Sequence, residues 1–120
     1  MTERPPTHVW PTLIYRDAPA AIAFLEEAFG FERVVAFADE DDPSVLVHVQ
    51  MNWPEGGGVM FGSVRDDSTF AARTPGNDAV YVVASDPDAV HARAVAAGAE
   101  VVMEPLDTDY GSRDLSLIHI

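Results

Sequence analysis

The chain has 120 residues, of which 48% are hydrophobic, and it contains no cysteine. This length suffices for one compact domain with its own core, and the missing cysteines exclude disulfides, thiolate nucleophiles and cysteine metal sites. Twenty acidic side chains oppose seven basic ones, and the resulting formal charge of −13 repels the phosphates of nucleic acids and of anionic membranes.

The first residues show no basic segment followed by an apolar stretch, and no run of about 18 apolar residues occurs in the sequence. We therefore expect a cytoplasmic protein with neither a membrane nor a nucleic acid as partner. The negative charge has two interpretations that stay open at this point: it keeps the protein soluble, or it attracts a cationic ligand.

The first predicted element is a strand over Thr12–Tyr15, where apolar and β-branched residues follow one another. A helix comes next, because Asp17 can cap its free amides and Pro19 fits its first turn. Gly30 ends this helix in a left-handed conformation. The apolar runs on either side of a turn-rich stretch then predict three more strands, at residues 33–37, 44–51 and 59–64.

Residues 65–77 are polar and turn-forming and are predicted to be a linker. After it the same order begins again, with a strand over Val80–Val83 and a helix that starts at Asp86 and stops at Gly98. Gly30 falls on Gly98 when the chain is shifted by 68 residues, which indicates an internal repeat. Two further strands are predicted in this second copy, at residues 100–104 and 113–119.

The order of these elements predicts an α+β fold of two βαβββ modules, the second one strand short, that form a curved mixed sheet around a pocket. We expect a single domain over residues 1–120, with the first module at about 7–64 and the second at about 78–120.

Two segments resemble a known family. Residues 13–31 (LIYRDAPAAIAFLEEAFGF) and 107–114 (DTDYGSRD) are similar to the vicinal-oxygen-chelate superfamily of glyoxalases, bleomycin-resistance proteins and dioxygenases, and to its PhnB-like or glyoxalase-like subgroup. The resemblance covers about residues 7–115 and implies the two-module fold around a small-molecule pocket. It implies no single activity, because this scaffold hosts lyases, dioxygenases, epimerases, thiol transferases and drug-binding proteins.

Metal-dependent members of this family, which resemble glyoxalase I, carry His, Gln or Glu on the first and fourth strands of each module. The corresponding positions here are Trp10, Phe61 and Ala79, and none of these side chains can bind a divalent ion. A shift of one residue would bring in Asp78, but one carboxylate is not a site. Family members also add a final strand with a further metal-binding carboxylate, so the different end of this sequence implies an altered or shortened C-terminus. We expect no cofactor, with a divalent metal ion as the alternative.

Strand alternation places His48 and Gln50 on the face opposite Val47 and Val49, the two valines that flank His48. If those valines pack on the helices, His48 and Gln50 face the concave side, where a ligand would lie. The predicted ligand-binding residues are Trp10, Thr12, His48, Gln50, Phe61 and Tyr81. Three alternatives stay open: His48 is satisfied by a neighbour or water, Trp10 and Phe61 fill the core, and Tyr81 faces either side of its strand.

The leading hypothesis is a metal-independent binding protein, resembling bleomycin-resistance proteins, that sequesters a cationic aromatic compound and serves antibiotic resistance. The alternative is a metal-dependent lyase or dioxygenase of the same superfamily, and a third is an interaction domain without a ligand. The sequence leaves open whether any catalysis occurs. A homodimer is predicted, because the second module ends in an unpaired sheet edge and residues 115–120 are almost wholly apolar.

Overall fold

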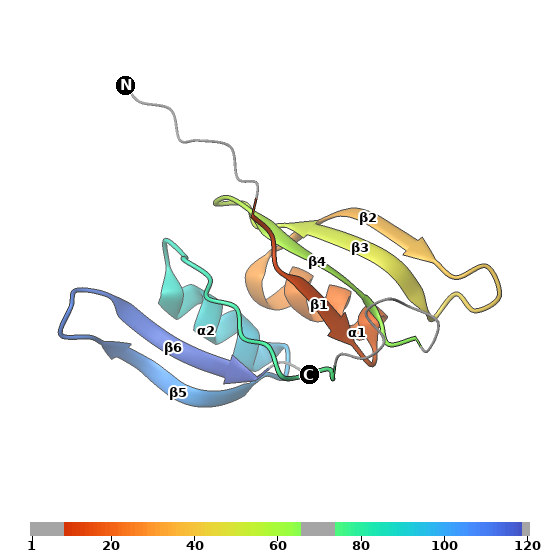
Figure 1. The fold of residues 1–120 in the computed structure, drawn as a ribbon. Coiled ribbons are helices and arrows are strands. Elements are labelled where there is room, and N and C mark those ends of the chain that lie inside the picture. The colour runs from red at the N-terminus through yellow and green to blue at the C-terminus, as the bar shows by residue number, and fades with distance from the viewer. Residues whose placement is uncertain (1–8, 66–73, 119–120) are drawn as a thin grey trace, which may run out of the picture.

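The computed structural model describes residues 9–65 and 74–118, and it shows a mixed α+β fold (Figure 1). Module one comprises the elements from residue 12 to residue 63, and module two those from residue 87 to residue 118. In chain order the elements are β1 (Thr12–Tyr15), α1 (Ala18–Phe24), the π-helix η1 (Leu25–Phe29), β2 (Glu32–Ala38), β3 (Leu46–Asn52), β4 (Gly58–Ser63), α2 (Pro87–Ala96), β5 (Glu100–Asp107) and β6 (Arg113–Ile118).

Module one is a four-stranded mixed sheet in the order β1-β4-β3-β2. Strand β1 runs parallel to β4, while β4, β3 and β2 are antiparallel to their neighbours. The turn-rich stretch between β3 and β4 is a hairpin, with Asn52 opposite Gly58. This arrangement confirms the βαβββ order predicted for the first copy, with strand ends that differ by only one or two residues.

The first helix begins and ends where the local sequence predicts. The Asp17 carboxylate accepts a hydrogen bond from the Ala20 amide at 3.1 Å, and Gly30 ends η1 with a φ of 80°. The last turn has π-helical geometry, and its carbonyl groups accept hydrogen bonds from a side chain outside the helix. Arg93 of α2 donates from Nε to the Glu27 carbonyl at 3.0 Å, so the second module helps to cap the helix of the first.

The core lies between this helix and one face of the sheet. Val49, Met51 and Phe61 are the largest fully buried side chains, and the ring of Phe61 meets Tyr15 edge-on with centroids 5.0 Å apart. Burying one large apolar side chain in this way stabilises the fold by roughly 1.5–3 kcal/mol. Module two contributes one fully buried residue among those described, Ala94 of α2.

Module two consists of α2 and a two-stranded antiparallel sheet of β5 and β6. Asp86 caps α2 through the Ala89 amide at 3.1 Å, as the sequence predicts. Arg113, at the start of β6, forms an ion pair with Asp88 at 3.0 Å and another with Asp107 at 3.2 Å. These pairs tie the start of β6 to α2 and to the end of β5.

The strand predicted at Val80–Val83 is wrong, because the structure shows no regular secondary structure there. Val80, Tyr81 and Val83 are 42%, 74% and 73% exposed. The reason lies in the pairing: β1, the counterpart in module one, bonds only to β4, and the described part of module two has no counterpart of β4. Without a ladder partner, the backbone of this apolar segment forms no strand.

The segment that follows the linker is nevertheless held against module one. The indole Nε1 of Trp53 donates to the Val83 carbonyl at 3.0 Å, and the Ser85 amide donates to the Glu55 carboxylate at 2.9 Å. Most of the predicted linker, residues 66–73, lies outside the described residues.

The two modules meet through their helices. Figure 1 shows α1, η1 and α2 in the middle of the molecule, with the four-stranded sheet on one side and the β5–β6 sheet on the other. Each sheet therefore has one face covered by helices and one face directed away from the other module, which we call its open face. None of the described helices has the length and apolar character needed to cross a membrane.

Candidate functional site

The open face of the four-stranded sheet is the candidate site. Val49 and Met51 of β3 are fully buried under the helices, so the residues between them point to the other side of the sheet. His48 and Gln50 lie on this open face and are half-buried. The sequence prediction rested on Val47 and Val49: Val49 is buried under the helices, whereas Val47 is 39% exposed, so the alternation holds from His48 to Met51 only.

Trp10 and Thr12 belong to the same face. Thr12 pairs with Met60 in the parallel β1–β4 ladder, and Met60 is opposite Gln50 in the β4–β3 ladder. The Trp10 ring lies directly on Gly58: a Cβ atom there would come within 2.5 Å of Cζ3 of the indole. The glycine is therefore required at this position by the close approach of the aromatic ring.

Phe61 lies on the other face. It is 2% exposed and sits opposite Val49 in the β3–β4 register, among the core residues. The prediction that Phe61 lines the pocket is therefore off by one residue along the strand. The alternative given for Phe61, that it fills the core, describes its position correctly. Met60 takes the open-face position instead, because neighbouring residues of a strand point to opposite sides of the sheet.

Two residues of β2 join this face that the sequence prediction missed. Val35 is opposite Gln50, and Phe37 is opposite His48. Phe37 is 63% exposed, which is unusual for so large an apolar side chain. The spacing of two residues between Val35 and Phe37 could have predicted that both point to one face. Irregularities in the β2–β3 register interrupt this alternation on either side of the pair.

Tyr81 is not on this face. Its hydroxyl donates to Oδ1 of Asp114 in β6 at 3.1 Å, so it belongs to the surface of module two. Four of the six predicted residues thus share the open face of module one, Met60 replaces the fifth, and the sixth lies elsewhere.

The open face combines apolar surface with a few hydrogen-bonding groups. Trp10, Val35, Phe37 and Met60 supply the apolar part. The Gln50 amide donates to the Asn52 side chain at 3.2 Å, which leaves its carbonyl oxygen available as an acceptor. A surface of this kind suits an aromatic organic compound with few polar groups.

Metal-ligating side chains do not gather in the part of the chain that the structure describes. Within residues 9–65 and 74–118, no three His, Cys, Asp or Glu side chains lie close enough together to hold a metal ion. The described residues of one chain therefore do not by themselves form a metal centre of the kind that metal-dependent family members require.

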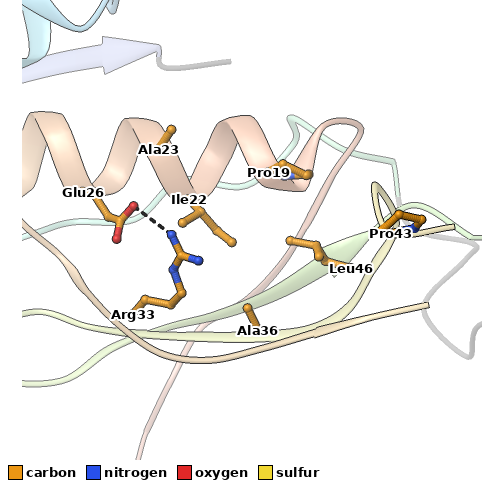
Figure 2. A pocket seen from close by; sticks show the side chains of 8 residues that line it. All are labelled: Pro19, Ile22, Ala23, Glu26, Arg33, Ala36, Pro43 and Leu46. Carbon is orange, nitrogen blue, oxygen red and sulfur yellow. Dashed lines mark hydrogen bonds and ion pairs between the residues drawn. The ribbon is translucent and has the colours of Figure 1, made fainter. Parts of the chain in front are cut away.

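A shallow groove of about 320 Å³ lies on the helix side of the same sheet, between α1 and strands β2 and β3 (Figure 2). Its apolar floor ends at an ion pair between Arg33 Nη2 and Glu26 Oε1, 3.2 Å apart. Both partners are well exposed, so this pair adds little to stability. The groove is lined by Pro19, Ile22, Ala23, Glu26, Arg33, Ala36, Pro43 and Leu46.

Comparison with known proteins agrees with this architecture. The family model of the Glyoxalase/Bleomycin resistance protein/Dioxygenase superfamily matches residues 7–115. No curated protein sequence gives a significant match.

Several solved structures are similar in fold. TioX from Micromonospora sp. ML1 is 24% identical, with a TM-score of 0.68 over 92% of this chain and 88% of TioX. A mutant of the fosfomycin resistance protein FosX from Listeria monocytogenes, complexed with Mn(II) and 1S,2S-dihydroxypropylphosphonic acid, is 20% identical, with a TM-score of 0.60 over 92% and 81% of the two chains. A glyoxalase/bleomycin resistance protein/dioxygenase from Nocardioides is 20% identical, with a TM-score of 0.62 over 98% and 79%. At these identities the likeness shows the fold.

Proposed function

The chain belongs to the glyoxalase/bleomycin resistance protein/dioxygenase superfamily, and from this premise we propose that it is a cytoplasmic homodimer that binds a cationic, partly aromatic small molecule without a metal ion. Sequestration of such a compound, as a form of antibiotic resistance, is the biological role that goes with this proposal.

The open face of module one carries the proposal. It presents Trp10, Phe37 and Met60 beside His48 and Gln50. A phenylalanine as exposed as Phe37 is unfavourable in water, and such exposed apolar side chains commonly mark a binding surface. The formal charge of −13 favours a cationic ligand over an anionic one, because the field of the whole protein attracts cations to its surface.

A second copy of the chain would complete the site. The open faces of the two sheets point away from each other in one chain, so a single chain does not enclose a ligand between them (Figure 1). Among the described strands, β6 pairs with β5 alone, and such an edge is normally covered in stable proteins. In the proposed dimer, each ligand lies between module one of one copy and module two of the other.

The binding test compares two dyes with the same ring system: N-methylacridinium, which is cationic, and acridine, which is neutral at pH 7.5. Equilibrium dialysis should show tighter binding of the cation. Phe37→Ala should weaken this binding, and His48→Ala should weaken it to a smaller extent through the lost contact of the imidazole with the dye ring, since N-methylacridinium has no group that donates or accepts a hydrogen bond. Val95→Ala, an exposed change on α2, is the control. Equal binding of both dyes, or none to either, would contradict the proposal.

The dimer is tested at Ile118, which is 52% exposed, whereas Leu117 packs against the core and is unsuitable for a charge. Sedimentation of the unmodified chain should give twice the mass of 13.0 kDa, and Ile118→Glu should give that of the monomer. If the ligand lies between two copies, this variant should also bind N-methylacridinium more weakly. A stable monomer of the unmodified chain at micromolar concentration would refute the dimer.

Metal-dependent lyase or dioxygenase chemistry is the alternative function, favoured by the likeness to FosX, which was crystallised with Mn(II). The described residues do not assemble a metal-binding group, so we derive no step through a metal. Metal content measured after purification without chelator separates the two functions. Stoichiometric nickel, zinc, manganese or iron would overturn the metal-independent proposal.

A further inference from the structure

Three side chains from separate segments meet on the open face of module two. The Tyr81 hydroxyl donates to Oδ1 of Asp114 at 3.1 Å, and the Tyr110 hydroxyl donates to Oδ2 of the same carboxylate at 3.2 Å. Tyr81 precedes α2, Tyr110 lies in the turn between β5 and β6, and Asp114 is in β6. Asp114 points away from α2, because its neighbour Arg113 faces that helix through its ion pair with Asp88.

The two tyrosine rings are exposed although their hydroxyl groups are engaged. Tyr81 is 74% exposed and Tyr110 is 79% exposed. The pKa of Tyr81 lies above its ordinary value, mainly because its hydroxyl donates to Asp114 and also because that carboxylate is negatively charged, so the hydroxyl stays a donor at neutral pH. Each ring is thus tethered at one end and leaves aromatic surface accessible beside the carboxylate.

The charge of Asp114 is not neutralised by a basic side chain among the described residues. Its hydrogen-bond partners there are two neutral hydroxyl groups, and the nearest guanidinium in sequence, that of Arg113, is engaged with Asp88 and Asp107. A carboxylate has about four acceptor positions, so two bonds leave room for a ligand. Leu106, which is opposite Asp114 in the ladder and 54% exposed, adds an apolar contact.

We propose that Tyr81, Tyr110 and Asp114 form a binding site for an organic ammonium group. A cation over an aromatic ring is attracted by the ring's quadrupole, and the adjacent carboxylate supplies a full opposite charge. Alkylated ammonium ions suit this site better than Na⁺ or K⁺, because their methyl groups are weakly hydrated and pack on ring faces and on Leu106. The site rests on the proposed function, in that this group would be the charged end of the ligand.

The test uses two probes of nearly the same shape: choline, which carries a trimethylammonium group, and 3,3-dimethylbutan-1-ol, in which carbon replaces the nitrogen. Each is titrated into the full-length protein at constant ionic strength, and the ring resonances of Tyr81 and Tyr110 are followed by NMR. Choline should shift both sets of resonances in a saturable way. The neutral alcohol should bind more weakly by about two- to fivefold or more, the range of an exposed cation–π contact.

Four variants locate the effect. Asp114→Asn keeps the shape of the side chain and should weaken choline binding by about two- to fivefold, while Asp41→Asn removes the same charge from a distant loop and should change it little. Tyr81→Leu removes the ring and should weaken binding by about two- to fivefold. Tyr81→Phe removes only the hydroxyl and should retain most of the binding, which a merely structural tie would not predict.

Equal affinities for choline and the neutral alcohol, or equal losses in Asp114→Asn and Asp41→Asn, would overturn the site. The experiments distinguish a failure of this site from a failure of the proposed function. If N-methylacridinium binds and responds to Phe37→Ala while choline leaves the tyrosines unshifted, only this inference falls. If choline binds at the tyrosines while Phe37→Ala leaves dye binding unchanged, the site stands and the open face of module one loses its assigned role.

Discussion

The two modules start from similar sequences and end as different structures. Module one forms a four-stranded sheet that packs on a core, whereas the described residues of module two form two strands and a helix. The apolar run Thr12–Tyr15 becomes β1 because β4 pairs with it, and the equally apolar Val80–Val83 remains without a ladder. The comparison teaches that an apolar run specifies a strand only where another strand supplies its hydrogen bonds.

Burial follows the same division. The described buried side chains lie almost entirely in module one, and Ala94 is the contribution of α2. Module two is therefore held by its contact with η1, where Ala94 packs and Arg93 bonds to the Glu27 carbonyl. A helix of this length gains most of its stability from such packing rather than from its own propensity.

The largest expected effect comes from the centre of module one. Phe61→Ala should lower the free energy of unfolding by about 3–5 kcal/mol, because it removes a buried ring and leaves a cavity. The same substitution at Phe37, which is 63% exposed, should cost less than about 1 kcal/mol. Urea denaturation of both variants measures the difference. Similar losses at the two positions would mean that the two faces of the sheet are assigned incorrectly.

Alkaline pH provides a second test, because a buried tyrosine lies in module one. Burial, with a smaller contribution from the charge of Asp78, raises the pKa of Tyr15 to about 12 from 10.0. The folded state then holds its proton more tightly than the unfolded state, so stability is complete below pH 10 and falls between about pH 10 and 12. The slope should be about 1.4 kcal/mol per pH unit at most. Tyr15→Phe should show a smaller decline than the unmodified chain over this range, measured by thermal melting.

A matched pair of valines compares the modules directly. Val49→Ala, at a fully buried position, should cost about 2 kcal/mol, since two methyl groups leave the core. Val83→Ala, at a position that is 73% exposed, should stay within about 0.5 kcal/mol. If Val83→Ala destabilised the protein as strongly as Val49→Ala, residues 80–83 would form a buried strand in solution after all.

The glycines that end the two helices should give the smallest difference. Gly30 and Gly98 both have positive φ, 80° and 96°, so alanine at either position should cost about 1–2 kcal/mol. Gly30→Ala should be the more costly, because its Cβ would lie 3.3 Å from Nη1 of Arg93, while the space at Gly98 is open. Thermal denaturation ranks the two variants. If Gly98→Ala were the more destabilising, Arg93 would not lie against the end of the first helix as the structure shows.

Local patterns in the sequence were sufficient for the helices and for most of the strands. Asp17, Asp86, Gly30 and Gly98 act within one helical turn, so their roles as caps and stops could be predicted from neighbouring residues alone. The alternation around His48 likewise placed this residue and Gln50 on the open face. Such patterns succeed because the interactions behind them join residues that are close in the chain.

Tertiary structure decided the features that depend on partners far away in the chain. The Val80–Val83 segment forms no strand because none of the described segments of module two pairs with it. Phe61 is in the core because the register between β3 and β4 sets it opposite Val49. The meeting of Tyr81 and Tyr110 at Asp114 joins residues 33 and 4 positions away from that carboxylate. The periodicity of one segment does not show which strand pairs with it, in which register, or which side chain lies opposite. These contacts form only when the sheets and helices pack together.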